Sequence, residues 1–470
     1  MRIIISAPGR SSGKTTISIG LCAALKEQGL KVAPFKKGPD YIDPMWLTAA
    51  AKTQCHNLDF FMMGEEKLIE VFQLAGQDTD LSVIEGNMGF YDGLDREGKD
   101  STSYLSKLLK APAILVIDAS RMTRGIAPLL LGYQQFEPDN LIKGVILNKV
   151  AGTRHEEKLK SAITQYCDVE VLGVLPGLDE IEIKERHLGL MPIKEDFRLM
   201  PIIESLANAV KRYVDLDAVL KLSASAVRQS SPFLPELEQN GIHPLTPASG
   251  GYFSSPTVRL GIARDTAFTF YYPENLVALQ QAGAELIPFN TLTDSRLPEV
   301  DGLYFGGGFP EMFIETLSEN RILRQEIQTA IEQGMPVYAE CGGLMYLAKS
   351  ISYNGTTKEM VGALPCDVKV YEKPQGHGYV TLEQTGKSNW FCFDGEIPGH
   401  EFHYSQIINP QGLDFAFRVI RGKGIDGSHD GIIYKNVIAG YTHLHSVGVP
   451  QWASQFVAFI QRCVKKRKVY

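Results

Sequence analysis

Short runs of apolar residues alternate with stretches of helical spacing through the amino-terminal part of this chain. Strands that are covered by helices on both faces read as continuous apolar runs. The alternation therefore predicts an α/β fold built on a doubly wound parallel sheet. The predicted strands lie at residues 3–5, 32–35, 81–84, 113–117, 144–147 and 171–174.

The same pattern returns after an interruption near the middle of the chain. Residues 223–256 are rich in Ser, Pro and Gly, which is typical of a linker. At about 150 residues per domain, the chain is also too long for one ordinary core. We expect domains at residues 1–222 and 257–470, joined by the linker 223–256. Strands of the second domain are predicted at residues 258–262, 285–288, 302–305 and 336–339.

Composition argues against several classes of protein. A formal net charge of −7 disfavours a nucleic-acid partner, because neutralising phosphates requires a surplus of Lys and Arg. The seven cysteines lack the paired spacing of a zinc or redox site, so a reducing compartment fits best. No segment has the length and apolarity of a membrane span or a signal peptide. We expect a cytoplasmic protein with small-molecule partners and no membrane partner.

A phosphate-binding loop follows the first predicted strand and precedes a helix. Gly13, Lys14, Thr15 and Thr16 stand where main-chain amides and a helix amino-terminus converge on an anion. Lys14 is expected to neutralise the terminal phosphates of ATP, and the Thr15 hydroxyl to hold Mg²⁺. The motif is imperfect, because Pro8 stands where its first glycine is expected.

Acidic side chains follow the second and third strands of this domain. Asp40 and Asp43 come after one strand, and Glu85 and Asp92 after the other. Ligands gather at the carboxyl ends of parallel strands. Each acid alone would be an ordinary turn residue, but four acids beside a triphosphate favour magnesium binding or substrate activation. Asn148, after a later strand, is placed to contact the nucleotide base or to cap a helix.

In the second domain, Cys341 lies between a predicted strand and a helix. A thiol on such a turn lies near main-chain amides that lower its pKa and bind an oxyanion. Gly342 directly follows the thiol, and Gly308, in a glycine-rich loop after another strand, offers the second amide. The alternative is a buried structural cysteine.

Histidines near the carboxy-terminus supply a base for this thiol. His443 and His445 would point to the same side of an extended strand, and a Cys and a His at separate strand ends are what thioester catalysis needs. We expect His443 to reach the thiol and His445 to be structural. For His403, substrate binding and plain loop chemistry remain equally open.

The motifs occur in the order found in cobyrinic acid a,c-diamide synthases, and the whole chain resembles that family. They are residues 7–16, 38–44, 57–59 (Asn-Leu-Asp), 85–86 (Glu-Gly), 339–343 (Ala-Glu-Cys-Gly-Gly) and 400–404 (His-Glu-Phe-His-Tyr). The resemblance implies a P-loop, dethiobiotin-synthetase-like domain joined to a class I glutamine amidotransferase-like domain. It further implies amidation of the a and c acetates of cobyrinic acid with ATP, Mg²⁺ and L-glutamine, through an acyl phosphate.

The resemblance also assigns roles to residues. Cys341 would be the nucleophile and His443 its base. Ordinary class I amidotransferases carry a Glu two residues beyond the catalytic His, whereas this chain has His445 there, which leaves open what orients His443. The residues expected to bind or activate the substrate are Asp40, Tyr41, Asp43, Asp92 and His403, and those expected to hold the metal are Thr15, Asp40 and Glu85.

Two alternatives remain. A nickel-sirohydrochlorin a,c-diamide synthase would share the motifs, because the acetates that it amidates are alike. A partition-type switch ATPase would share the first domain, but such switches carry a second lysine early in the phosphate loop, where this chain has Gly9 and Arg10. They also lack a glutaminase half. The sequence leaves the oligomeric state open, a homodimer included.

Overall fold

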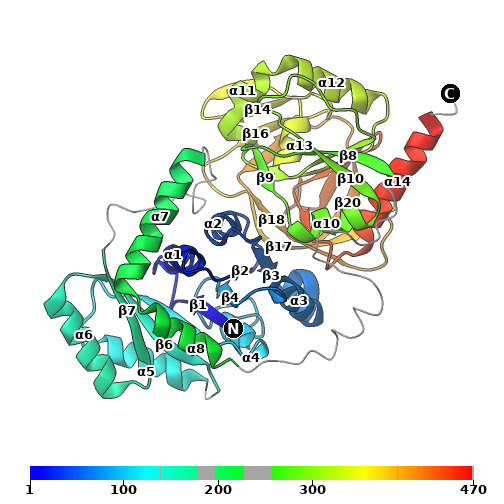
Figure 1. Ribbon diagram of the computed structural model, residues 1–470. Helices are drawn as coiled ribbons and strands as arrows, with labels where there is room; N and C mark the ends of the chain where they lie inside the picture. Colours follow the sequence, from blue (N-terminus) through cyan, green and yellow to red (C-terminus); the bar gives the residue numbers. More distant parts are fainter. Residues whose placement is uncertain (138, 178–195, 227–256, 389, 468–470) are drawn as a thin grey trace. The chain divides into compact units, whose positions relative to one another are not determined.

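The computed structural model describes residues 1–137, 139–177, 196–226, 257–388 and 390–467 (Figure 1). Internal contacts divide the chain into two compact units, residues 1–60 with 68–243 and residues 61–67 with 244–470. Most of the predicted linker lies outside the described residues, and helix α8 (Leu216–Ala224) extends two residues into it. The domain bounds predicted from the sequence therefore stay a proposal.

The first unit contains a seven-stranded sheet in the order β3-β2-β4-β1-β5-β6-β7. Every neighbouring pair of strands is parallel, which confirms the predicted fold class. The strands are β1 (Arg2–Ser6), β2 (Val32–Lys37), β3 (His56–Leu58), β4 (Leu81–Glu85), β5 (Ala113–Asp118), β6 (Ile142–Val150) and β7 (Glu170–Pro176). All the predicted strands are present, and β3 is an additional edge strand that is too short to show a pattern.

Helices cover this sheet. They are α1 (Lys14–Glu27), α2 (Ile42–Ala51), α3 (Phe60–Gly76), α4 (Thr102–Leu108), α5 (Ile126–Phe136), α6 (Thr153–Tyr166), α7 (Asp196–Tyr213) and α8. Helix α1 is buried from Ile17 through Leu25 and packs against α2 and α7, while α5 packs against α6 (Figure 1). Gly29, with φ +91°, follows the end of α1 in a conformation that favours glycine.

The second unit is built on a ten-stranded mixed sheet in the order β10-β8-β11-β13-β22-β21-β20-β17-β18-β23. The stretch from β10 to β22 is parallel, and every later pair is antiparallel. The predicted strands form most of the parallel part. The strands are β8 (Val258–Ala263), β10 (Ala284–Phe289), β11 (Gly302–Phe305), β13 (Val337–Glu340), β17 (Gly376–Gln384), β18 (Ile397–His403), β20 (Asp414–Arg421), β21 (His429–Tyr434), β22 (Val437–Gly440) and β23 (His443–Leu444).

Smaller elements complete this unit. Strands β9 (Phe268–Phe270) and β12 (Gly307–Gly308) form a short pair, and β14 (Ser350–Tyr353), β15 (Thr356–Glu359), β16 (Asp367–Val370) and β19 (Ser405–Ile408) form a separate sheet. The helices are α10 (Pro273–Gln281), η2 (Pro310–Phe313), α11 (Ile314–Glu319), α12 (Arg321–Glu332), α13 (Gly342–Leu347) and α14 (Gln451–Arg467). Two apolar clusters form its core, and one of them contains Cys341.

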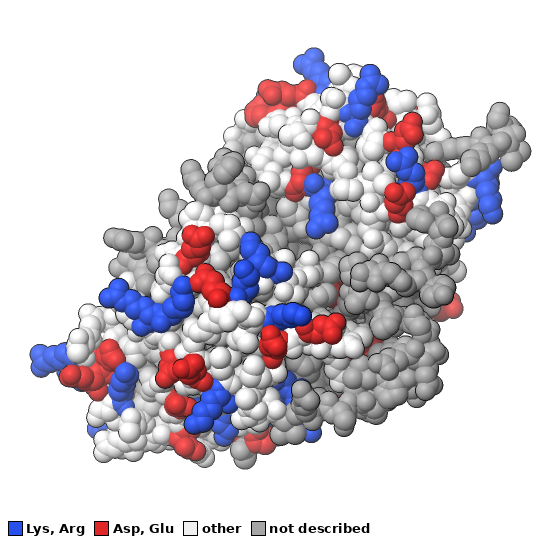
Figure 2. All heavy atoms as spheres, viewed as in Figure 1, with Lys and Arg blue, Asp and Glu red and all other residues white. Residues whose placement is uncertain are grey.

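Acidic and basic side chains are interspersed over the face shown in Figure 2. In the part of the chain that the structure describes, no helix is long and apolar enough to cross a membrane.

Candidate active sites

The phosphate loop is held by a close contact with the end of strand β6. Gly13 has φ +90° and precedes helix α1, in a conformation that suits glycine. Asn148 donates a hydrogen bond from Nδ2 to the Ser12 carbonyl at 3.0 Å, and a Cβ on Gly13 would lie only 2.3 Å from that nitrogen. Asn148 therefore holds the phosphate loop in place. Its contact with a nucleotide base stays a prediction.

A buried lysine links the acids that the sequence singled out. Lys36, at the end of β2, places its Nζ 2.5 Å from Asp43 Oδ2 and 2.9 Å from Glu85 Oε1. The Thr15 hydroxyl donates to the same Glu85 oxygen at 2.5 Å. Sequence reasoning missed Lys36, although a lysine pair closing an otherwise apolar strand was a signal that could have found it.

Charge and burial oppose one another in this network. Burial alone would lower the pKa of Lys36, but the carboxylates of Asp43 and Glu85 reverse that effect and raise it. Burial raises the pKa of Glu85 although Lys36 and Lys14 oppose the shift. The pKa of Lys14 is lowered, first by burial and then by the charge of Lys36. An anion beside Lys14 would favour its charged form.

The chemistry of these side chains fits a magnesium ion bound with a nucleotide. Glu85 Oε2 is buried and has no hydrogen-bond partner among the described residues, and Thr15 adds a hydroxyl beside the other oxygen. No group of three or more His, Cys, Asp or Glu side chains in the described ranges could hold a metal by itself. Phosphate oxygens would have to complete the coordination, and the metal roles of Thr15, Asp40 and Glu85 stay predictions.

The remaining predicted acids of this unit organise turns. Asp40 Oδ1 accepts hydrogen bonds from the amides of Ile42 and Asp43, and burial, followed by the charge of Asp43, raises the pKa of Asp40 to about 6. Asp92 Oδ2 accepts from the Gly89 amide at 3.0 Å. Tyr41 lies in the Asp40 turn. Their roles toward a substrate stay predictions.

In the second unit, Cys341 occupies a strained turn between β13 and α13. Its φ of 47° and ψ of −100° lie outside the ordinary regions for a residue with a side chain. The turn is fixed by a hydrogen bond from the Cys341 amide to the Gly440 carbonyl at 2.7 Å. The sequence-based prediction of a strand, a tight turn and a helix is confirmed.

Gly308 and Gly342, the two glycines expected to provide oxyanion contacts, lie close together. A Cβ on Gly342 would lie 2.9 Å from the Gly308 nitrogen, and one on Gly307 would lie 2.5 Å from the His443 ring. A hydrogen bond with the Gly342 main chain favours the thiolate of Cys341. Side chains at these glycines would occupy the space around the reacting atoms.

Glu340, the residue directly before Cys341, contacts His443. Its Oε2 lies 3.3 Å from His443 Nδ1. The hydroxyls of Tyr304 and Tyr338 each donate to its carboxylate at 3.1 Å, and the Leu444 amide donates at 3.2 Å. Glu340 and His443 are both buried, so water does not screen the pair. Glu340 is therefore placed to orient His443, a role to which the sequence had assigned no residue.

A second buried acid, Asp430, fixes the main chain just before His443. Asp430 accepts hydrogen bonds from the amides of Gly431, Tyr441 and Thr442 and from the Thr442 hydroxyl. These bonds tie β21 to the end of β22 and thereby fix the residues that lead into His443. Sequence reasoning missed Asp430, because two of its partner residues, Tyr441 and Thr442, lie 11 and 12 residues further along the chain.

The other histidines have separate surroundings. His445 Nε2 lies 3.4 Å from Glu274 Oε2, and its Nδ1 accepts from the Val447 amide. His403 stacks on Tyr441 with ring centroids 3.7 Å apart, and its Nδ1 lies 2.8 Å from the Ser405 carbonyl oxygen. These contacts fit structural roles, and the role of His403 toward a substrate stays a prediction.

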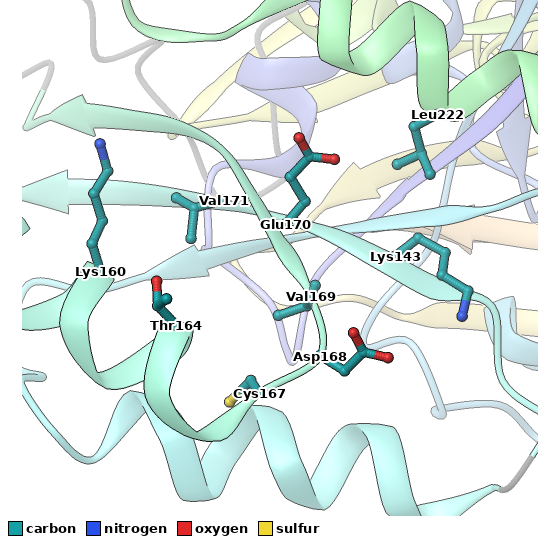
Figure 3. A pocket seen from close by; sticks show the side chains of 9 residues that line it. All are labelled: Lys143, Lys160, Thr164, Cys167, Asp168, Val169, Glu170, Val171 and Leu222. Carbon is teal, nitrogen blue, oxygen red and sulfur yellow. The ribbon is translucent and has the colours of Figure 1, made fainter.

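The first unit also has an open pocket, and none of the predicted site residues line it (Figure 3). Helix α6 contributes Lys160, while Lys143 and Glu170 stand at the amino ends of β6 and β7. Substrate sites of doubly wound sheets form at the opposite, carboxyl ends of the strands. We assign no catalytic role to this pocket.

Comparison with known proteins identifies both halves of the chain. Residues 3–190 match the CobQ/CobB/MinD/ParA nucleotide binding domain, and residues 259–449 match the CobB/CobQ-like glutamine amidotransferase domain. Similar proteins named cobyrinate a,c-diamide synthase align over nearly their full lengths. The Magnetococcus marinus protein is 46% identical over 97% of both chains. The Archaeoglobus fulgidus protein is 40% identical, and the alignment covers 99% of this chain and 98% of the relative.

These alignments extend across both units, so they cover the nucleotide-binding half and the thiol-bearing half together. The chain belongs to the cobyrinate a,c-diamide synthase family of glutamine-dependent amidating ligases.

Proposed function

We propose that this enzyme amidates the a and c acetate carboxylates of cobyrinic acid, with ATP, Mg²⁺ and L-glutamine. The contact between Glu340 and His443 beside the strained Cys341 turn carries the proposal, because it supplies a glutaminase with an oriented base. The names of the relatives supply the tetrapyrrole. A soluble cytoplasmic enzyme fits these small-molecule substrates.

Glutamine hydrolysis begins at the thiol. With Glu340 beside Nδ1, His443 carries its proton on that nitrogen, and Nε2 is the atom that accepts the thiol proton. Cys341 attacks the carboxamide carbon, and the amides of Gly308 and Gly342 stabilise the oxyanion. His443 returns the proton to the leaving nitrogen, ammonia departs, and water then hydrolyses the thioester.

The resting thiol is not yet activated. Burial raises the pKa of Cys341, and the charges of Glu311 and Glu340 raise it further. Proton transfer to His443 therefore has to accompany binding of glutamine rather than precede it.

The first unit activates the acceptor. An acetate oxygen attacks the γ-phosphorus of ATP, and ADP leaves as the acyl phosphate forms. Lys14 offsets the phosphate charge, Lys36 holds the Glu85 carboxylate in place, and Thr15 and Glu85 would hold the magnesium ion that supplies further charge neutralisation. Ammonia then attacks the acyl carbon, and inorganic phosphate leaves.

Substrate choice separates this proposal from the nickel-sirohydrochlorin alternative. The purified enzyme should be given ATP, glutamine and either tetrapyrrole, and each product should be weighed by mass spectrometry. We expect two amide conversions on cobyrinic acid and slower reaction of nickel-sirohydrochlorin. Faster conversion of the nickel compound would replace the substrate assignment. The partition-type ATPase is disfavoured, because it has no use for an amidotransferase domain at residues 259–449.

A further inference from the structure

The loop that carries Glu311 packs directly against the turn of the nucleophile. A Cβ on Gly342 would lie 2.9 Å from the Gly308 nitrogen and 3.0 Å from the Pro310 Cδ. The Gly343 amide also donates to the Gly306 carbonyl at 3.1 Å. Glu311, one residue beyond Pro310, is therefore anchored beside Cys341.

The carboxyl group of Glu311 lacks a cationic partner within the described chain. The residue is partly exposed, yet its Oε2 atom is buried and accepts no hydrogen bond from the described residues. Burial raises its pKa to about 7, and a hydrogen bond from its own main chain opposes that shift. After burial, the charge of Glu311 is also the largest influence that raises the pKa of Cys341.

Three other buried acids of this unit differ from Glu311 in this respect. Glu401 accepts from the amides of Lys423 and Gly424, and Asp430 accepts from three amides and a hydroxyl. Glu340 has its tyrosine and histidine contacts. A buried carboxylate without such partners costs free energy that a cationic ligand would recover.

We propose that Glu311 binds the α-ammonium group of L-glutamine while Cys341 attacks the carboxamide. This inference rests on the proposed glutaminase reaction and adds the residue that recognises its substrate. The ammonium lies three carbon atoms from the carboxamide carbon, roughly 5 Å away in an extended substrate. The Cys341 thiol thus reacts at the carboxamide end of L-glutamine, while the Glu311 carboxylate binds its ammonium end.

Binding of the ammonium has a second consequence. It neutralises the charge that most opposes formation of the Cys341 thiolate. The substrate therefore helps to activate the nucleophile that attacks it. A glutamine analogue that lacks the ammonium loses both binding and this activation.

The test compares two amide substrates in two enzymes. In Glu311→Gln, kcat/KM for glutamine should fall about tenfold to a hundredfold, mainly through KM, because a charged hydrogen bond contributes about 1.5–3 kcal/mol. Glutaramate, the same molecule without the α-ammonium, should react at least as fast in Glu311→Gln as in the unchanged enzyme, because it has no ammonium contact to lose and the variant removes a charge that opposes the Cys341 thiolate. Synthesis driven by ammonium chloride should be unchanged, which shows that the variant is folded.

Glu315→Gln is the matched control, since Glu315 is an exposed residue of α11 that pairs with Lys358. It should leave all three activities unchanged. Equal losses on glutamine and glutaramate, or an unchanged kcat/KM for glutamine in Glu311→Gln, would overturn the assignment of Glu311 while leaving the role of Cys341 intact. If Glu311→Gln does not fold, Glu311→Asp serves instead, and the same selective loss on glutamine is required.

Discussion

At the scale of single residues, both candidate sites depend on a buried carboxylate with a specific partner. Glu85 pairs with Lys36 and accepts from Thr15, and Glu340 contacts His443 and accepts from two tyrosines. Burying a charge costs several kcal/mol unless its partners are well placed. Each carboxylate therefore fixes the geometry of the groups around it.

Glu340→Gln should reduce glutamine-dependent synthesis about 10²- to 10⁴-fold, mainly in kcat. Gln keeps the shape of the side chain but removes the charge that stabilises protonated His443. Steady-state kinetics with glutamine and with ammonium chloride measure the effect, and the ammonium-driven rate should not change.

Glu274→Gln provides the control for that experiment, since Glu274 and His445 form another buried Glu–His contact in the same unit. This variant should retain most of its glutamine-dependent kcat. If the two variants lose activity equally, the loss reflects disturbed packing and Glu340 has no special role in positioning His443.

Lys36→Met should destabilise the protein by about 3–5 kcal/mol, because it leaves the buried Glu85 and the partly buried Asp43 without their cation. Synthesis should be lost with either nitrogen source. The double variant Lys36→Met/Glu85→Gln should recover part of the stability in denaturant unfolding, since it removes one of the uncompensated charges. No recovery would show that the Lys36–Glu85 contact contributes little to stability.

At the scale of elements, each site lies between a strand and the helix that follows it, in the phosphate loop between β1 and α1 and in the tight turn between β13 and α13. Gly13 and Cys341 both have positive φ and both precede a helix, α1 and α13. The sequence predicts these turns because their small residues are contiguous. It does not predict the partners that fix them, since Asn148 and Gly440 lie on strands that are far away in the sequence.

Gly13→Ala should weaken ATP binding by at least tenfold in calorimetry, because its Cβ would meet Asn148 Nδ2 at 2.3 Å and its φ of +90° disfavours alanine. Gly9→Ala, in the same loop, should have little effect, because a Cβ there meets no atom within 4 Å. Equal ATP affinity in the two variants would count against a phosphate loop that Asn148 holds in place.

Some strands could likewise be predicted from a local sequence pattern, and others could not. Continuous apolar runs predicted most strands in the parallel parts of the two sheets, because burial on both faces leaves a continuous pattern. The three-residue β3, the parallel strand β22 and the antiparallel part of the second sheet were not predicted. Strands such as β20, with the exposed residues Asp414 and Arg418, carry polar side chains that weaken the pattern.

At the scale of the whole molecule, we propose that one reaction is divided between the two units. The sequence predicted this division from the ordered motifs, and the family assignment confirms that the chain is a glutamine-dependent ligase. It did not predict Lys36, Glu340 or Glu311, because their roles arise from contacts between residues that periodicity does not relate.

Product formation by Cys341→Ala, measured with glutamine and with ammonium chloride at saturating ATP, tests the central claim most directly. The account predicts that synthesis is lost with glutamine and retained with ammonium salt, because the acyl phosphate forms without the thiol. Retention with glutamine, or loss with both nitrogen sources in a folded variant, would contradict it.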